Sequence, residues 1–233
     1  ATSYTDAENF RKKGANAFCI TNGFDVDAST TLSMTEENSK TLPLSNSTTK
    51  FTLSYIGVLE QLRNPEILWE TLNDLVQENA DFKNDFQLKF VGRLDDKILQ
   101  KIESSPLKNN LTNLGYQTHD VALKHMQDSS VLLITNFPQE SSKGIIPGKI
   151  FEYLATGKTI LSFGPKDADV EKILNETKAG KHFGYDEKEN LKKFILESYE
   201  NWKSGTLNQN AENIEQFSRK NLTQKLVDLM NKI

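Results

Sequence analysis

From Phe51 onward, two patterns of apolar residues alternate along the chain. Short apolar runs of strand character are each followed by a segment in which apolar residues recur at helical spacing. The predicted strands are FTLSYIG (51–57), FQLKFVG (86–92), NNLTNLG (109–115), VLLIT (131–135) and TILSF (159–163). The predicted helices follow them at 65–79, 95–104, 120–129, 147–157 and 169–177. Such alternation is typical of repeated βαβ units, so we expect an α/β fold built on a parallel sheet.

Two segments depart from this alternation. Residues 29–50 are dominated by Ser, Thr, Asn and Glu and include Pro43. Such a stretch cannot supply a core element, so it is interpreted as a polar linker or insertion. Beyond Lys188 the apolar spacing is helical to the end of the chain, which predicts a helical C-terminal tail that packs across the sheet or reaches toward a partner domain.

Composition narrows the possible classes of function. With 233 residues and 36% hydrophobic residues, the chain can bury a full core. The 28 basic and 32 acidic residues give a net charge of -4 without a long basic run, so nucleic acid is not an expected partner. Cys19 is the one cysteine, and no clustered His/Cys spacing favours a structural metal, which fits a reducing cytoplasm. We also expect neither a signal peptide nor a membrane span, because no run of about 18 apolar residues occurs.

The candidate chemistry lies where predicted strands end. Gly57 and Gly92 each close a strand, and in open α/β sheets ligands bind outside the carboxyl ends of the strands. The segment 141–163 is the most informative, because Gly144, Pro147 and Gly148 form a loop whose backbone can approach a ligand closely. A helix from Lys149 would direct its positive N-terminus at that loop, which predicts a phosphate site.

Four segments then resemble one family in the right order. GKIFEYLATGKTIL (148–161) resembles the glutamate-bearing helix, turn and strand in the C-terminal domain of retaining GT-B glycosyltransferases, the glycosyl transferases group 1 or family 4-like proteins. ITNGFDVD (20–27), YIGVLEQLRNPE (55–66) and VLLITN (131–136) resemble further segments of the same family. The resemblance implies a Rossmann-like doubly wound parallel sheet, the donor-binding half of a GT-B enzyme, with a helical C-terminal tail. It divides the chain into the end of a preceding acceptor domain (1–28), the polar segment (29–50) and the nucleotide-sugar binding domain (51–233).

The resemblance also implies roles for individual residues. Glu152 would accept hydrogen bonds from the ribose hydroxyls, because a carboxylate can accept from two neighbouring O–H groups. Arg63 and Lys149 would hold the diphosphate and stabilise charge on it as it leaves. The other expected donor-binding residues are Gly57 in the first turn, Gly144, Ile145 and Ile146 through their backbone, and Tyr116 and Gln117 at the base. The alternative for each charged group is a solvated surface side chain, and for Tyr116 a packing role.

Three features differ from the family pattern. Gly144 stands where many members carry a second glutamate, and Glu140 lies four residues upstream, where it is a candidate to take over the sugar contact. Val58 follows Gly57 where many relatives have a second arginine, which places more of the diphosphate binding on Arg63 and Lys149. The three histidines, His119, His125 and His182, show no metal-ligand spacing and are interpreted as structural or exposed.

The expected activity is transfer of a sugar from a nucleotide-diphosphate sugar to an acceptor hydroxyl with retention, in bacterial surface or capsular polysaccharide or glycoconjugate synthesis. No cofactor and no metal are expected. The expected partner is an N-terminal acceptor domain of the same protein, without which this chain would be inactive, and the full enzyme would be cytoplasmic or peripheral at the inner face of the membrane. Two alternatives stay open: a nucleotide-sugar epimerase of GT-B fold and a non-catalytic nucleotide-binding module. The base (UDP or GDP), the sugar and the acceptor are not specified by the sequence.

Overall fold

The computed structural model describes residues 1–25, 50–208 and 211–232. The polar segment predicted at 29–50 lies outside the described residues, except for Lys50. No helix among the described residues is both long enough and apolar enough to cross a membrane.

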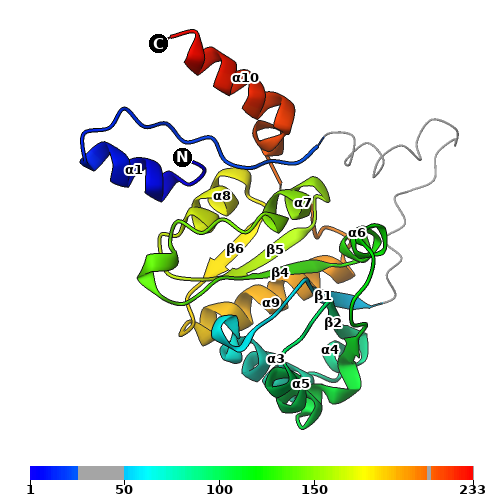
Figure 1. Ribbon diagram of the computed structural model, residues 1–233. Helices are drawn as coiled ribbons and strands as arrows, with labels where there is room; N and C mark the ends of the chain where they lie inside the picture. The colour runs from blue at the N-terminus through cyan, green and yellow to red at the C-terminus, as the bar shows by residue number, and fades with distance from the viewer. Residues whose placement is uncertain (26–49, 209–210, 233) are drawn as a thin grey trace, which may run out of the picture.

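A single parallel sheet forms the centre of the structure (Figure 1). Within the described residues it has six strands in the order β3-β2-β1-β4-β5-β6. The strands are β1 (Phe51–Ile56), β2 (Phe86–Val91), β3 (Leu111–Asn113), β4 (Val131–Thr135), β5 (Thr159–Phe163) and β6 (Gly180–Phe183). This order is the doubly wound Rossmann order, in which the direction of winding reverses between β1 and β4. The predicted α/β fold with a parallel, Rossmann-like sheet is confirmed.

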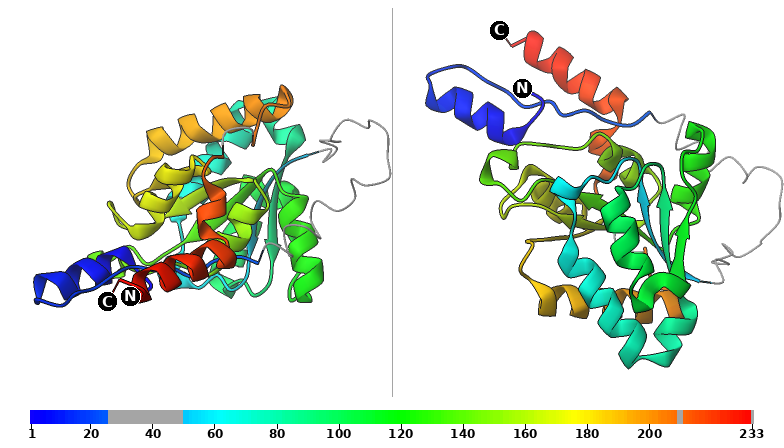
Figure 2. Two further views of the ribbon diagram at one scale, coloured as in Figure 1. Left: turned by 90° about the horizontal axis from the view of Figure 1, so that it is seen from above. Right: turned by 60° about the horizontal axis from the view of Figure 1, so that its bottom comes forward.

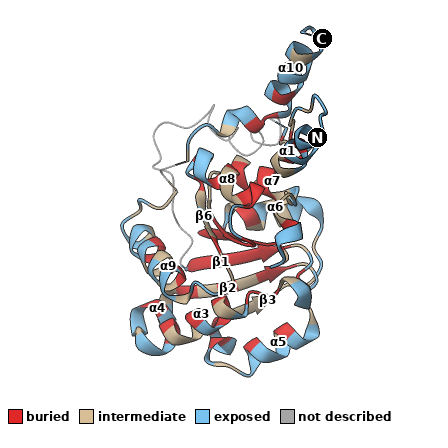
Figure 3. Ribbon diagram, turned by 90° about the vertical axis from the view of Figure 1, so that its left-hand side faces the viewer, coloured by how far each residue is buried: buried red, intermediate tan, exposed pale blue. Residues whose placement is uncertain are grey.

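Helices cover both faces of the sheet (Figure 3). The first face carries α3 (Glu66–Glu78), α4 (Ala80–Asp85), α5 (Asp96–Glu103) and α9 (Lys188–Lys203), and the second carries α6 (His119–Gln127), α7 (Lys149–Ala155) and α8 (Asp169–Thr177). Short 3-10 turns connect them: η1 (Gln61–Arg63), η2 (Pro106–Asn110), η3 (Glu140–Ser142) and η4 (Ile214–Phe217). Because both faces are covered, every residue of β1 and β4 is buried, which explains the apolar run of β4; in β1 the buried polar residues Thr52 and Ser54 alternate with apolar ones.

Neighbouring residues of β1 serve the two opposite cores. Tyr55 packs into the cluster built on α3, α5 and α9, whereas Ile56 packs into the cluster built on α6, α7 and α8. This follows from the alternation of side chains along a strand. The aromatic residues Trp69 and Phe90 meet edge to face on the first side, with ring centroids 5.8 Å apart. The indole N–H of the buried Trp69 donates to Asn64 Oδ1 at 2.6 Å, so this donor is not left unpaired in the core.

Both ends of the chain lie together beyond the second face (Figures 1 and 2). The helix α1 (Tyr4–Lys12) begins at Ser3, whose hydroxyl accepts from Asp6 N at 2.9 Å as an N-cap. The segment after α1 is tied to the start of α10 (Arg219–Met230) because Phe24 N donates to Phe217 O at 3.1 Å and Arg219 N donates to Phe24 O at 2.8 Å.

Some elements differ from the sequence expectation. The predicted helical C-terminal tail is confirmed as α9 and α10, but α9 ends at Lys203, Gly205 after it adopts a φ of 72°, and α10 begins only after the N-cap Ser218. The edge strand β6 and the short helix α4 were not predicted. The sequence of β6, GKHF, is too short and polar to show strand periodicity, and its strand form follows from pairing with β5.

Gly180 gives a direct test of that edge pairing. A Cβ added to Gly180 would lie 1.9 Å from the Ile160 carbonyl oxygen, so Gly180→Ala should force β6 away from β5 and lower the free energy of unfolding by about 1–3 kcal/mol. Urea unfolding followed by circular dichroism measures this. Gly148→Ala is the matched control, because Gly148 has a φ of -55° and an added Cβ would meet nothing within 4 Å. Equal stability of the two variants would contradict the tight β5–β6 contact.

Candidate functional site

The candidate site lies where the winding of the sheet reverses. β1 and β4 pair side by side, yet the chain leaves β1 toward η1 and α3 on the first face and leaves β4 toward α7 on the second. Their connections therefore separate and leave an open edge at the carboxyl ends of the two strands. Arg63 comes from the first connection, and Lys149 and Glu152 come from the second.

Arg63 is a partly buried cation with an unused donor. Its Nη2 donates to the Val58 carbonyl at 3.1 Å and to Glu60 Oε2 at 3.2 Å, and its guanidinium lies 5.5 Å from the centroid of the Phe137 ring. The side chain is 22% exposed. Its Nε is buried and has no hydrogen-bond partner among the described residues. Because buried donors are normally paired, Arg63 has capacity for an additional acceptor.

Lys149 reaches the same edge from the other face of the sheet. Its Nζ donates to the Ile56 carbonyl at 2.7 Å and lies 4.3 Å from the centroid of the Tyr55 ring. A Cβ on Gly57, whose φ is +121°, would lie 2.9 Å from Nζ, so the glycine leaves room for the ammonium group. The pKa of Lys149 is lowered to about 8, chiefly by burial and next by the nearby charge of Arg63, while the charge of Glu152 opposes both effects. Two neighbouring cations without a full complement of acidic partners favour an anionic ligand.

Glu152 lies one turn into α7 and faces a pocket of about 490 Å³. The pocket is lined by four parts of the chain: the segment after α1, the helix α6, the helix α7 with the glycine before it, and the start of α10. Its lining residues are Asn22, Gly23, Phe24, Asp25, His119, Leu123, Gly148, Glu152, Ala155 and Arg219. An ion pair between Arg219 Nη1 and Asp25 Oδ2, at 2.8 Å, joins two of these residues. The volume falls in the range of small-molecule sites.

The glycine loop before α7 is folded tightly against its surroundings. A Cβ on Gly144 would lie 2.9 Å from Ser3 Oγ, so this glycine is packed against the start of α1. The Ile145 N–H already donates to the Ser142 carbonyl at 2.9 Å, which leaves it unavailable to a ligand in this conformation. Ile146 packs against the apolar cluster of the second face.

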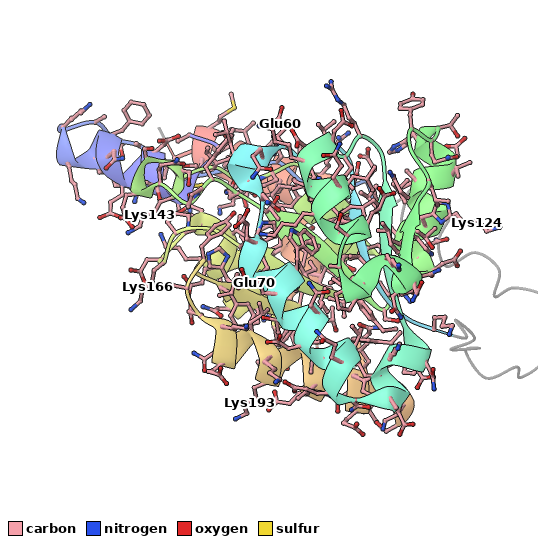
Figure 4. All side chains as sticks on the ribbon, turned by 90° about the horizontal axis from the view of Figure 1, so that it is seen from below. Glu60, Glu70, Lys124, Lys143, Lys166 and Lys193 are labelled. Carbon is pink, nitrogen blue, oxygen red and sulfur yellow. The ribbon has the colours of Figure 1, made fainter. Side chains whose placement is uncertain are left out.

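Other predicted site residues lie apart from this group. The carboxylate of Glu140 is 76% exposed and pairs with Lys143 Nζ at 2.7 Å, on the loop that passes beside α1 (Figure 4). Tyr116 is 88% exposed in the loop between β3 and α6, and Gln117 Nε2 donates to the Leu114 carbonyl at 2.9 Å. None of these three residues lines the pocket that Glu152 faces.

The structure also brings in residues to which the sequence assigned no role in the site. His119, interpreted as structural or exposed, lines the pocket beside Glu152. Asn136, which is 2% exposed, follows β4 and donates through Nδ2 to the Ile145 carbonyl at 2.7 Å. Tyr153 is buried, and its hydroxyl has no hydrogen-bond partner among the described residues. The signal for Asn136 was present, since a polar residue directly after an apolar strand stands at the ligand-binding edge. Nothing in the sequence pattern distinguishes His119 from other helix residues.

Comparison with known proteins gives matches only at the level of structure. The chain matches no protein-family model and no curated protein sequence. Anabaena HepE in complex with UDP superposes with a TM-score of 0.72 at 18% identity, over 100% of this chain and 63% of HepE. A mutant of S. aureus TarM, in complex with Fondaparinux, alpha-GlcNAc-glycerol and UDP, gives 0.67 at 18% identity, over 98% of this chain and 43% of TarM. WaaG, a glycosyltransferase involved in lipopolysaccharide biosynthesis, gives 0.60 at 13% identity, over 95% of this chain and 60% of WaaG.

These likenesses establish the fold. The chain shares its Rossmann-like α/β fold with part of each of these three proteins and spans less than two thirds of the length of each. At identities below one fifth, the comparison carries no residue roles, so the site is argued from its own geometry.

The buried position of Lys149 predicts a dependence of stability on pH. Because its pKa is about 8 in the folded chain and 10.5 when unperturbed, the folded state binds fewer protons than the unfolded state between these values. The contribution of Lys149 to the free energy of unfolding should therefore rise with pH across this window, by on the order of 1–3 kcal/mol. The difference in urea stability between the parent and Lys149→Met, measured at pH 7.5 and 10.5, isolates this contribution.

Lys97→Met, at an exposed position on α5, is the control and should keep the pH dependence of the parent. If Lys149→Met also follows the parent across the window, the ammonium group of Lys149 is not buried as described.

Proposed function

We propose that this chain binds a nucleotide-diphosphate sugar and forms the donor half of a glycosyltransferase. The observation that carries the proposal is the meeting of Arg63 and Lys149 at the sheet edge where the winding reverses, next to a pocket that contains Glu152. Two cations suit a diphosphate, and a neighbouring carboxylate suits the two hydroxyls of a ribose. The arrangement therefore matches the ribose and the diphosphate of a nucleoside diphosphate.

The nucleoside is expected in the pocket of Glu152. In this arrangement Glu152 accepts hydrogen bonds from the ribose, and α6 supplies His119 and Leu123 to the side on which the base would lie. Tyr116 and Gln117 do not line this pocket, but they lie in the loop that leads into α6 and are the proposed contacts to a base that extends beyond it, made by stacking and by backbone. Backbone contacts of this kind recognise a base without a diagnostic side chain. The residues therefore do not specify whether the nucleotide is UDP or GDP.

The diphosphate is expected between Arg63 and Lys149. In the proposed reaction the bond between the anomeric carbon of the sugar and the distal phosphate oxygen breaks while the acceptor hydroxyl oxygen bonds to that carbon, and the hydroxyl proton passes to the released diphosphate. Negative charge develops on the departing diphosphate as the bond breaks. The guanidinium of Arg63 and the ammonium group of Lys149 stabilise that charge, and both are already held in place by the Val58 and Ile56 carbonyls. Glu140 would need to leave its pair with Lys143 to reach a donor sugar.

The comparisons support the class of ligand. HepE and TarM have been solved with UDP, and WaaG is described as a glycosyltransferase. Because this chain spans only part of such proteins, we propose that an acceptor-binding domain completes the enzyme and that this chain alone does not turn over. Retention of the anomeric configuration, a role in bacterial surface polysaccharide or glycoconjugate synthesis, and a cytoplasmic location peripheral to the inner membrane belong to the same proposal.

Calorimetry with UDP, GDP and their glucose and mannose derivatives tests donor binding. One nucleoside diphosphate should bind, and Arg63→Ala and Glu152→Ala should each weaken it by about 1–3 kcal/mol, since each removes a charged hydrogen bond from a partly buried site. The controls are Arg11→Ala on α1 and Glu103→Ala at the end of α5, both exposed and distant from the sheet edge.

Three outcomes would count against the assignment. If the two site variants bind as well as the parent, the ligand lies elsewhere. Equal affinities for a nucleoside diphosphate with and without its sugar would favour a non-catalytic nucleotide-binding module. An epimerised nucleotide sugar, rather than a glycosylated acceptor, in reactions of a protein that includes the acceptor domain would favour the epimerase.

A further inference from the structure

Asn136 is a buried junction between three segments of the site. It directly follows β4, is 2% exposed, and its backbone N–H donates to the carbonyl of Phe163 at the end of β5, at 2.8 Å. Its side chain and its own carbonyl then contact two further segments that lie far away in the sequence. An asparagine buried in this way is held in one orientation, because the amide group that donates the hydrogen bond would be costly to leave unpaired.

The side chain of Asn136 fixes a peptide plane in the glycine loop. Its Nδ2 donates to the Ile145 carbonyl at 2.7 Å. The peptide between Ile145 and Ile146 is trans, so its carbonyl and its N–H point in opposite directions. The carbonyl points at Asn136, and the N–H of Ile146 therefore points away from it. That N–H donates no hydrogen bond to another described residue, which leaves it available to an acceptor outside the chain.

The carbonyl of Asn136 is held by a second side chain. The hydroxyl of Tyr185, in the loop after β6, donates to it, and the Tyr185 ring lies against Phe163 with centroids 5.6 Å apart. This bond fixes the peptide between Asn136 and Phe137. Phe137 in turn is the ring over which the guanidinium of Arg63 lies. Tyr185 thus holds the segment that contacts Arg63, whereas the side-chain amide of Asn136 holds the glycine loop before α7.

We propose that Asn136 and Tyr185 are positioning residues for the diphosphate end of the donor. Asn136 orients the Ile146 N–H toward the phosphate that bears the sugar, and Tyr185 keeps Phe137 beneath Arg63. This inference rests on the proposed function, because it assigns the source of the backbone contact within that site. Of the three loop residues expected to offer amides, it selects Ile146, since the Ile145 N–H is bound to Ser142 and Gly144 is packed against α1.

The test compares ligands with and without the distal phosphate. Calorimetry with UMP and UDP, and with GMP and GDP, is carried out on the parent, Asn136→Leu and Tyr185→Phe. Leucine keeps the branched shape and the number of heavy atoms of asparagine but cannot donate to the Ile145 carbonyl, and phenylalanine removes only the hydroxyl. Both variants should bind the diphosphate about 5- to 10-fold more weakly, and the monophosphate within about twofold of the parent.

Matched controls separate positioning from general destabilisation. Asn110 is also buried, at 9% exposure, and donates to the Lys83 and Phe86 carbonyls at 2.7 and 2.8 Å at the opposite, amino edge of the sheet. Tyr199 on α9 donates its hydroxyl to Asp85 Oδ2 at 2.6 Å. Asn110→Leu and Tyr199→Phe should lower the unfolding midpoint as the site variants do, yet leave the affinities for both phosphates unchanged.

The outcomes distinguish failure of the proposed function from failure of the positioning role alone. A parent that binds neither diphosphate overturns the proposed function and the positioning role with it. A parent that binds while both variants keep the ratio of diphosphate to monophosphate affinity overturns the positioning role alone. Should Asn136→Leu fail to fold, Tyr185→Phe, which removes a single hydroxyl, gives the decision by the same ratio.

Discussion

The pairing of β1 with β4 is the constraint on which the site depends. These strands lie next to each other in a parallel sheet, but the chain must leave them on opposite faces, since one continues into α3 and the other into α7. The backbone therefore separates at their carboxyl ends, and side chains from both faces meet there. Arg63 and Lys149, distant in sequence, become neighbours for this reason alone, and no local interaction between them would bring two cations together.

The proximity of the two cations needs compensation, and the backbone supplies part of it. Lys149 Nζ is held by the Ile56 carbonyl and the face of Tyr55, and Arg63 by the Val58 carbonyl and Glu60. These partners orient the charges without neutralising them fully, and burial, together with the nearby charge of Arg63, lowers the pKa of Lys149 to about 8. A site that is held in place while its charge remains uncompensated is suited to a ligand that brings negative charge.

The second half of the site depends on parts of the chain that are not in the sheet. The segment from Asn22 to Asp25 closes the pocket of Glu152, and it is tied to the start of α10 through the backbone of Phe24. The buried carboxylate of Asp169 holds the first turn of α1, accepting from Thr5 N at 3.0 Å and Thr5 Oγ1 at 2.8 Å. The two chain ends thus complete the pocket, whereas the sheet edge provides the charges.

The sequence by itself determined the α/β class, most of the strands, and the residues at the strand ends, because apolar runs buried on both faces and glycines at sharp turns leave marks in a linear pattern. It also placed Arg63, Lys149 and Glu152 at that edge. Only the tertiary structure decided that His119 lines the pocket and that Glu140 pairs with Lys143 instead of facing the pocket. It also decided that the Ile145 N–H is hydrogen-bonded within the chain and that Asn136 holds the glycine loop. These features arise from hydrogen bonds and contacts between segments brought together by folding, and a periodicity read along one segment contains no information about its partners.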